Sequence, residues 1–197
     1  MSDPVLAVEQ LGFSYGAKQA LSEVTFSLSA GSYYALLGPN GAGKSTLFSI
    51  LCQLLQPQSG SVTVNGISAA KKPRQVLKQV GMVFQQPTLD LDLSVEQNLA
   101  YHASLHGLSN AYTKQRINEE LQRFALSERR KDKVRSLNGG HRRRVEIARA
   151  LLHQPAILLL DEATVGLDQS TRDTINEHLR QLCSDSGITI LSSTHLI

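Results

Sequence analysis

The sequence of 197 residues contains no tryptophan, only two cysteines, and no apolar run that approaches the length of a membrane span. Cys52 and Cys183 form neither a CxxC pair nor a metal-ligand spacing, so we interpret them as core or surface thiols of a cytosolic protein. No basic stretch followed by an apolar run opens the chain, so we expect no signal peptide. Any work at a membrane would therefore go through a partner.

The sequence also lacks a strong excess of charge. Its net charge is +3, with 41% hydrophobic and 19% charged residues, which is an ordinary globular composition for one sizeable domain and does not by itself indicate a nucleic-acid partner. Basic residues do cluster at 129–133 and 142–144. The simplest interpretation is a solvated helix face, and the alternatives are contact with a partner protein, acidic lipid or nucleic acid.

The most informative segment is a glycine-rich motif near residue 40. Gly38, Gly43, Lys44 and Ser45 fit the pattern G-x-x-x-x-G-K-[ST]. An apolar stretch at 33–37 predicts a strand before it, and leucine and isoleucine at helical spacing predict a helix over 46–55. Strand, glycine loop and helix form the arrangement that a phosphate-binding loop needs. The candidate nucleotide-binding residues are Gly38, Pro39, Asn40, Gly41, Ala42, Gly43, Lys44, Ser45 and Thr46.

The chemistry of this loop follows from its residue types. Glycines allow successive backbone N–H groups to approach phosphate oxygens, and the following helix adds the positive end of its dipole. Lys44 can neutralise the β- and γ-phosphates, and the Ser45 hydroxyl can bind Mg²⁺. The alternative is a glycine-rich turn that happens to contain Lys-Ser. The motif therefore predicts a site for a nucleoside triphosphate and Mg²⁺.

The rest of the chain divides into three parts. Short apolar or alternating runs at 5–8, 24–28, 61–66 and 80–84 predict strands in the first part. Between residues 93 and 135 we expect a helical insertion, with one helix opened by Ser94 and Gln97 and a second over 113–124. The last part returns to α/β, because the continuous apolar run at 156–161 suits a parallel strand that is covered on both faces.

Two acids end that apolar run, at the place where a parallel sheet presents functional groups. Asp161 is placed to hold Mg²⁺ through its water shell, and Glu162 to orient or deprotonate an attacking water. An acid pair at a strand end is weak evidence alone, but the phosphate loop gives it a specific meaning.

A further segment, Leu137, Asn138, Gly139, Gly140 and His141, is followed by a basic stretch and a helical pattern just before the acid-ending strand. Here the chain resembles the ATP-binding cassette (ABC) family of transporter ATPases over nearly its whole length. The segment is similar to that family's L-S-G-G-Q signature. Four further positions match family motifs in the family's order. Tyr15 matches the aromatic residue that stacks on adenine, and Gln85 matches the glutamine that touches metal and water. Asp168 matches the D-loop, and His195 matches the histidine that contacts the γ-phosphate.

The resemblance implies an α/β fold of the P-loop NTPase type, with a RecA-like parallel sheet core, an N-terminal antiparallel β subdomain and a helical insertion. It implies one domain over 1–197, in which the β-rich part and loop core occupy about 1–92, the helical subdomain about 93–152, and the resumed core 153–197. The implied catalytic residues are Glu162, His195 and Gln85, and the implied metal-binding residues are Ser45, Gln85 and Asp161.

The resemblance also implies partners. Two cassettes, expected to be identical copies, would pair head to tail, so that the 137–141 segment of one completes the ATP and Mg²⁺ site of the other. A membrane-spanning permease subunit would hold the pair at the cytoplasmic face of the inner membrane, and no nucleic acid is expected. The closest likeness is to drug-efflux exporters, and to a branch associated with quinoprotein (PQQ-dependent) alcohol oxidation systems.

Several positions depart from the family pattern. Asn138 replaces the signature serine and is as good a helix cap, while His141 replaces glutamine and Ala163 replaces the proline after the catalytic glutamate. Family members usually continue for some tens of residues past the histidine, so we expect this chain to be a fragment or a truncated product. The alternative functions are a non-transport ATPase in translation or DNA repair, and an inactive cassette. One cassette without a long heptad insertion disfavours the former. The inactive cassette is disfavoured by intact Lys44, Asp161, Glu162 and His195, and favoured by the missing tail.

Overall fold

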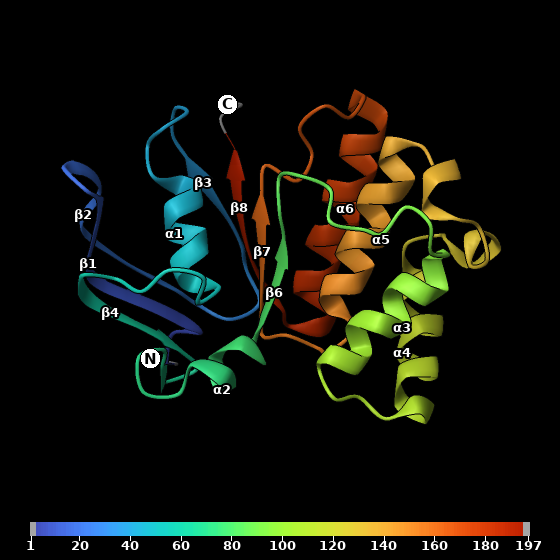
Figure 1. Cartoon of the computed structure of the whole chain (residues 1–197), viewed down its shortest axis with the longest axis horizontal. Coiled ribbons are helices and arrows are strands. Elements are labelled where there is room, and N and C mark those ends of the chain that lie inside the picture. The colour runs from blue at the N-terminus through green and yellow to red at the C-terminus, as the bar shows by residue number, and fades with distance from the viewer. Residues whose placement is uncertain (1–2, 195–197) are drawn as a thin grey trace.

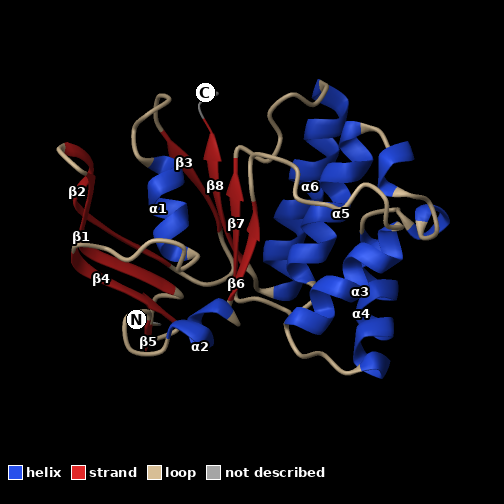
Figure 2. Ribbon diagram, viewed as in Figure 1, coloured by secondary structure: helices blue, strands red, loops and turns tan. Residues whose placement is uncertain are grey.

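The computed structural model describes residues 3–194, which form two four-stranded sheets and a group of helices (Figures 1 and 2). The antiparallel sheet has the order β2-β1-β4-β5 and the parallel sheet the order β3-β8-β7-β6. The strands are β1 (Leu6–Tyr15), β2 (Lys18–Leu28), β3 (Tyr33–Leu37), β4 (Ser59–Val64), β5 (Ile67–Ser68), β6 (Val80–Val83), β7 (Ile157–Asp161) and β8 (Thr189–Thr194). The predicted fold class, an α/β protein with a parallel core and an N-terminal antiparallel sheet, is confirmed.

The helices lie on both faces of the parallel sheet. Helix α1 stands between the two sheets, and α5 and α6 cover the opposite face, with α3 and α4 beyond them (Figure 1). The helices are α1 (Lys44–Leu51), α2 (Pro73–Leu77), α3 (Val95–Leu105), α4 (Asn110–Arg123), α5 (Gly139–Leu151) and α6 (Gln169–Ser186), with 3₁₀ turns η1 (Ser127–Arg129) and η2 (Val134–Ser136).

The position of strand β7 between two cores explains why its sequence is continuously apolar. All five of its residues are buried, and they alternate between two cores. Leu158 and Leu160 pack with α5 and α6, whereas Ile157 and Leu159 pack with α1 and the antiparallel sheet. A strand covered on both faces has no solvent side to keep polar, as predicted from the run.

The observed helix bounds differ from the predicted ones by up to four residues, and α4 runs over Asn110–Arg123 rather than 113–124. The capping box at the start of α3 is present: the backbone N–H of Gln97 donates to Ser94 Oγ, and that of Ser94 donates to Gln97 Oε1. Helix α1 begins at Lys44 rather than at 46, and it ends at Leu51 rather than at 55. Strand β1 runs well past the predicted 5–8 and includes Tyr15, because irregular pairing with β2 and β4 continues there.

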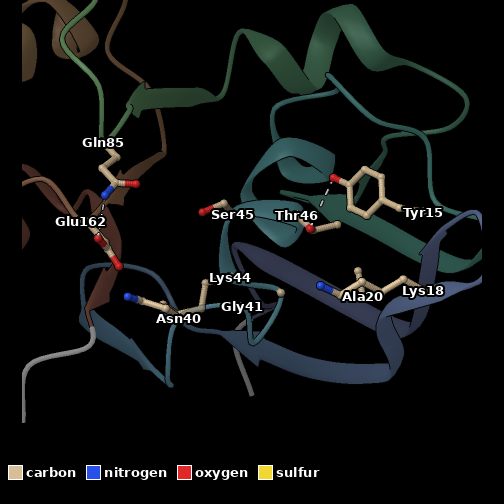
Figure 3. Close-up of a pocket in the computed structure, with 11 residues that line it drawn as sticks. Tyr15, Lys18, Ala20, Asn40, Gly41, Lys44, Ser45, Thr46, Gln85 and Glu162 are labelled. Atoms are coloured by element: carbon tan, nitrogen blue, oxygen red, sulfur yellow. Dashed lines mark hydrogen bonds between the residues drawn. The ribbon is translucent and has the colours of Figure 1, made fainter.

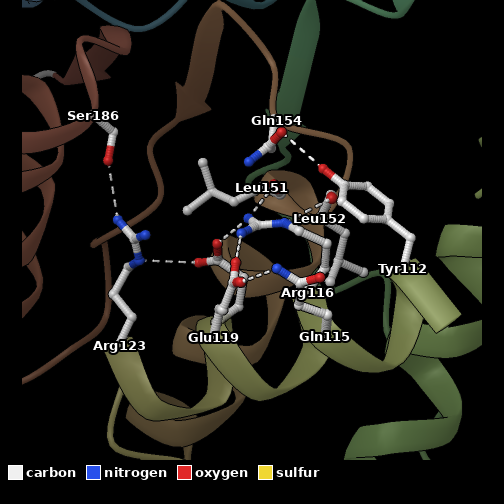
Figure 4. Close-up of polar contacts among 10 residues, drawn as sticks. Tyr112, Gln115, Arg116, Glu119, Arg123, Leu151, Leu152, Gln154 and Ser186 are labelled. Atoms are coloured by element: carbon white, nitrogen blue, oxygen red, sulfur yellow. Dashed lines mark hydrogen bonds and ion pairs between the residues drawn. The ribbon is translucent and has the colours of Figure 1, made fainter.

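A buried arginine of α4 fastens that helix to the end of α5 (Figure 4). Arg116 pairs with Glu120, and both side chains are almost fully buried. The same guanidinium donates to the carbonyls of Leu151 and Leu152, each at 3.2 Å. These carbonyls lie where a helix has no partners of its own and where its dipole is negative, so the arginine satisfies both the end of α5 and one oxygen of the buried carboxylate.

Candidate functional site

The glycine loop joins β3 to α1 and leaves the start of that helix open. Gly43 is the N-cap residue, its φ is 90°, and no side chain caps the helix. A β-carbon at Gly43 would lie 2.4 Å from the carbonyl oxygen of Ala20, so only glycine fits. The first N–H groups of any helix have no partner within the helix. The loop therefore presents donors and the positive end of a dipole to one point, which suits an anion.

Lys44 lies across this loop. Its ammonium group donates to the carbonyls of Gly38 at 2.5 Å and Pro39 at 2.9 Å, and the residue is buried. The two contacts hold a positive charge at the mouth of the loop, beside the N–H groups.

A pocket of about 430 Å³ opens over the loop (Figure 3). Lysines line it at two positions and an acid at one, and its remaining lining is polar or small. The lining residues are Tyr15, Lys18, Ala20, Asn40, Gly41, Gly43, Lys44, Ser45, Thr46, Gln85 and Glu162.

An aromatic platform stands at one side of the pocket. Tyr15 is 53% exposed, and its ring meets Phe13 edge-on with centroids 4.9 Å apart. The Thr46 hydroxyl donates to the Tyr15 hydroxyl at 3.5 Å, a long contact that fixes the ring only loosely. An exposed aromatic ring offers a face on which a planar base can stack.

The opposite side of the pocket carries Gln85 and Glu162, which come from the ends of β6 and β7. Gln85 Nε2 donates to Glu162 Oε2 at 3.0 Å (Figure 3). Arg143 of α5 donates to the carbonyl of Gln85 at 3.0 Å and pairs with Glu146 at 2.8 Å, so the segment that carries Gln85 is held by a buried ion pair.

Asp161 lies below this pair and does not line the pocket. It is buried, and its Oδ1 accepts a hydrogen bond of 2.7 Å from Ser193, whose Oγ in turn accepts from the backbone N–H of Glu162 at 3.1 Å. Ser193 thereby fixes both acids of the pair.

Burial, followed by the negative charge of Asp161, raises the pKa of Cys52 to about 12, which makes this thiol inert.

The 137–141 segment lies outside the pocket lining. Leu137 is buried, and Asn138 caps α5 by accepting from the backbone N–H of His141 at 2.8 Å. The same Asn138 oxygen lies 2.7 Å from His141 Nδ1, and burial, with Arg144 and Arg129 nearby, lowers the pKa of His141. The predicted cap is confirmed.

The two glycines of that segment face α6 and the loop before it. A β-carbon at Gly140 would lie 2.7 Å from Thr171 Cγ2, and one at Gly139 would lie 3.7 Å from Leu167. Asp168 caps α6, accepting from the N–H and hydroxyl of Thr171 at 2.9 and 2.7 Å, and the N–H bond is the main cause of its lowered pKa. His195 lies outside the described residues.

Three residues near the predicted site were missed from the sequence. Lys18 and Ala20 line the pocket because β1 and β2 form a hairpin directly after Tyr15, and a lysine three residues past that aromatic residue was the available signal. Ser193 carried no signal, because its role depends on the pairing of β7 with β8.

The arginines at 142–144 are not a solvated face. Arg142 donates to the carbonyls of Val134 and Arg135, Arg144 donates to that of Phe124, and Arg143 is buried. The solvated-face interpretation of this cluster is therefore wrong, because the arginines serve loop carbonyls around α5.

The donors present fit a nucleotide with Mg²⁺. The open helix start, Lys44 and Lys18 suit phosphates, and the oxygens of Ser45, Gln85 and Asp161 are the hard ligands that Mg²⁺ prefers. Mg²⁺ keeps several waters and uses substrate phosphates as ligands, so it needs no closed cage of side chains.

A family model described as "ABC transporter" matches residues 21–165 of this chain. The chain belongs to the ABC transporter ATP-binding family. Three relatives illustrate its range. Linearmycin resistance ATP-binding protein LnrL of Bacillus subtilis is 37% identical over 97% of this chain and 61% of its own length. Nod factor export ATP-binding protein I of Ralstonia nicotianae is 37% identical over 100% and 61%. Methionine import ATP-binding protein MetN 3 of Oceanobacillus iheyensis is 40% identical over 90% and 53%.

A solved member of the ABC family has the same fold. The structure of cbiO1 from Clostridium perfringens, described as part of the ABC transporter complex cbiONQ, superposes with a TM-score of 0.90 at 31% identity. The match covers 99% of this chain and 80% of that one. The chain spans about three fifths of the length of the first curated relatives that it matches. Between residues 3 and 194, no helix is long and apolar enough to span a bilayer.

Proposed function

We propose that this chain binds ATP with Mg²⁺ and hydrolyses it, as one half of a head-to-tail pair of cassettes that drives a membrane permease. The observation that carries the proposal is the pocket itself. Gln85 and Glu162 meet at 3.0 Å on the side of the pocket opposite Tyr15, while Asn138, Gly139 and Gly140 lie outside the lining. Among residues 3–194, the pocket lining thus includes the phosphate loop, Gln85 and the proposed base, and it contains no residue of the 137–141 segment.

The residues act mainly by positioning and by charge. Tyr15 stacks on the adenine, and Lys44 with the start of α1 holds the β- and γ-phosphates. Mg²⁺, held by Ser45, Asp161 and Gln85, would neutralise charge on the transferred phosphoryl group. Glu162 accepts the proton of the attacking water, and Gln85 fixes that carboxylate. We place His195 at the γ-phosphate and the 137–141 segment of a second copy on the open side.

Substituting Glu162→Gln tests the base. We expect ATP hydrolysis to fall at least 100-fold, because a general base contributes about 10²–10⁴ in rate, while ATP still binds. Without hydrolysis the ATP-bound pair should accumulate, as size-exclusion chromatography with light scattering would show. The control is Glu128→Gln, an exposed acid in η1, which should hydrolyse ATP at the parent rate. Parent-level turnover by Glu162→Gln would remove Glu162 from the base position.

The proposed cargo direction is export. Relatives named for drug resistance and for Nod factor export support it, whereas the methionine importer shows that the same domain serves import. We place the chain at the cytoplasmic face of the inner membrane, held by its permease, and the quinoprotein-associated branch stays a prediction. Uptake assays with everted vesicles that contain the assembled transporter distinguish the two directions, because an exporter loads such vesicles when ATP is outside.

A further inference from the structure

Three of the six histidines of the chain gather at one place away from the nucleotide pocket. His102 lies in α3, His106 at the end of α3, and His153 in the connection between α5 and β7. Each ring offers one nitrogen, and these three atoms all lie within 4.8 Å of one another. The rings of His106 and His153 stack with centroids 3.8 Å apart, and those of His102 and His106 are 4.8 Å apart.

Two ring nitrogens of this cluster are buried and unpaired among residues 3–194, namely His102 Nε2 and His153 Nδ1. The tautomer of His153 follows from its other nitrogen, which lies 3.0 Å from the carbonyl oxygen of Val80. A carbonyl only accepts, so Nε2 carries the hydrogen and Nδ1 of the neutral ring carries a lone pair. A histidine that donates one N–H to a backbone carbonyl and keeps a lone pair on its other nitrogen has the usual arrangement of a metal ligand.

The pKa values of the three rings agree with a role as metal ligands. Burial, together with the charge of Arg149 and the two other rings, lowers the pKa of His102 to about 3. Burial and His106 lower the pKa of His153 to about 4, and burial lowers that of His106. All three shifts favour the neutral imidazole, which is the form that binds a metal.

We propose that His102, His106 and His153 form a binding site for a divalent transition metal ion of the Zn²⁺ class, with a fourth position left to water. Imidazole nitrogen suits Zn²⁺, Ni²⁺ and Cu²⁺, whereas Mg²⁺ and Ca²⁺ prefer oxygen. Zn–N bonds of about 2.0–2.1 Å in tetrahedral geometry place the nitrogens about 3.3 Å apart. The rings of His106 and His153 are stacked at an interplanar angle of 12°, so their in-plane lone pairs do not converge as they stand. To bind an ion, His106 at the partly exposed end of α3 must rotate its ring out of the stack.

One charge opposes the ion. Arg149 faces His102, but its guanidinium is turned to Thr88, donating to the carbonyl at 3.0 Å and also to the hydroxyl. Its repulsion weakens the site without blocking it. A bound ion would join α3 to the connection that leads into β7, and so fix the outer helices to the parallel sheet. The site shares no residue with the nucleotide pocket, so its test needs no ATP.

The experiment is a metal titration of the purified, untagged protein. Co²⁺ should give the visible absorption of a low-coordinate nitrogen site, and Zn²⁺ should abolish that absorption stoichiometrically. Zn²⁺ at 100 times its Kd should raise Tm by about 5–10 °C. Absence of binding to Co²⁺ and Zn²⁺ overturns the proposal, as does binding that leaves Tm unchanged.

Variants locate the site. His106→Asn and His153→Ala should each weaken Zn²⁺ binding at least about 100-fold, because loss of even an outer-shell partner costs 10–100-fold. The matched control is His178→Ala in α6, because His178 also has a buried unpaired ring nitrogen but belongs to no cluster in the described chain. Arg149→Gln should tighten Zn²⁺ binding several-fold, which a merely structural group of stacked rings does not predict. Zn²⁺ affinity that is unchanged in both His106→Asn and His153→Ala means an adventitious site and overturns the proposal. His106→Asn keeps a residue that helix ends tolerate, so the test does not depend on a variant that fails to fold.

Discussion

Two helices of this protein begin at glycine-containing segments that we assign to phosphate, and they begin differently. Helix α1 follows Gly43, and no side chain caps it. Helix α5 follows Asn138, whose side-chain oxygen already accepts the backbone N–H of His141. The first start is therefore open to an anion, whereas the second is partly satisfied from within the chain.

The glycines at the two starts also serve different ends. Gly43 is in the left-handed region and abuts the backbone of Ala20, which cannot move without displacing β2. Gly140 abuts a side-chain methyl, that of Thr171, at a position where backbone shape makes no demand for glycine. The comparison teaches that the α1 start is a complete anion site, while the α5 start is a packed surface that offers the Asn138 amide and its remaining N–H groups to a second copy, as we propose.

Gly43→Ala should have the largest effect, which is a loss of affinity for ATP. The added β-carbon strains a φ of 90° and meets a carbonyl oxygen at 2.4 Å, so the loop must move. Loss of two charge-assisted hydrogen bonds, at about 1.5–3 kcal/mol each, weakens ATP binding about 100-fold or more. Calorimetric titration with ATP and Mg²⁺ measures the change.

The control for Gly43→Ala is Gly66→Ala in the turn between β4 and β5. Gly66 also has a left-handed φ, of 71°, but open space surrounds its β-carbon position. The Gly66→Ala variant should lose about 1–2 kcal/mol of stability and keep its affinity for ATP. Equal affinity of the Gly43→Ala variant and the parent would contradict the assignment of the open helix start to phosphate.

Gly140→Ala should have an intermediate effect, lowering both the stability and the ATPase rate. Adding Thr171→Ser separates the loss of stability from the loss of ATPase rate. The clash with the methyl of Thr171 should cost about 1–3 kcal/mol of stability. Serine removes the methyl and keeps the hydroxyl that donates to Asp168. The double variant should therefore recover Tm, whereas its ATPase rate should stay about 10-fold below the parent, because the added methyl still faces the second copy.

Thermal melts and steady-state ATPase assays on the same preparations read out this pair, with Thr171→Ser alone as the control. Recovery of the ATPase rate together with Tm would mean that Gly140 is needed for internal packing only. The contrast between the two helix starts would then fail at α5.

The nucleotide pocket could be predicted because its parts are short segments whose residue types declare their chemistry. The loop around Lys44 and the acids at the end of β7 are contiguous in sequence, and the local geometry follows from glycine and from the end of a parallel strand. Ser193 could not be predicted, because its contacts with Asp161 and Glu162 exist only once β8 pairs with β7.

The same reason explains the other misses. The arginines at 142–144 resemble a solvated patch until the loops whose carbonyls they serve are in place. The three histidines are 4 and 47 residues apart along the chain, and only the packing of α3 against α5 brings His153 to the other two. Interactions that depend on long-range packing leave little trace in a single sequence, whereas caps such as Asn138 act within four residues and were predicted.

Substitutions of Asn138 should change the stability least, and they give the finest test of the comparison. Asn138→Ala removes the α5 cap and should cost about 1 kcal/mol, which lowers Tm by about 2–4 °C. Asn138→Ser, which restores the family's residue, should keep both Tm and ATPase rate. Asn138→Asp keeps a capping oxygen but replaces the amide with a carboxylate, so it should keep Tm and lose ATPase activity through repulsion of the phosphate of the facing site. If the Asn138→Asp variant keeps both its Tm and its ATPase rate, the α5 start contacts no phosphate. The two helix starts would then differ in function as well as in construction.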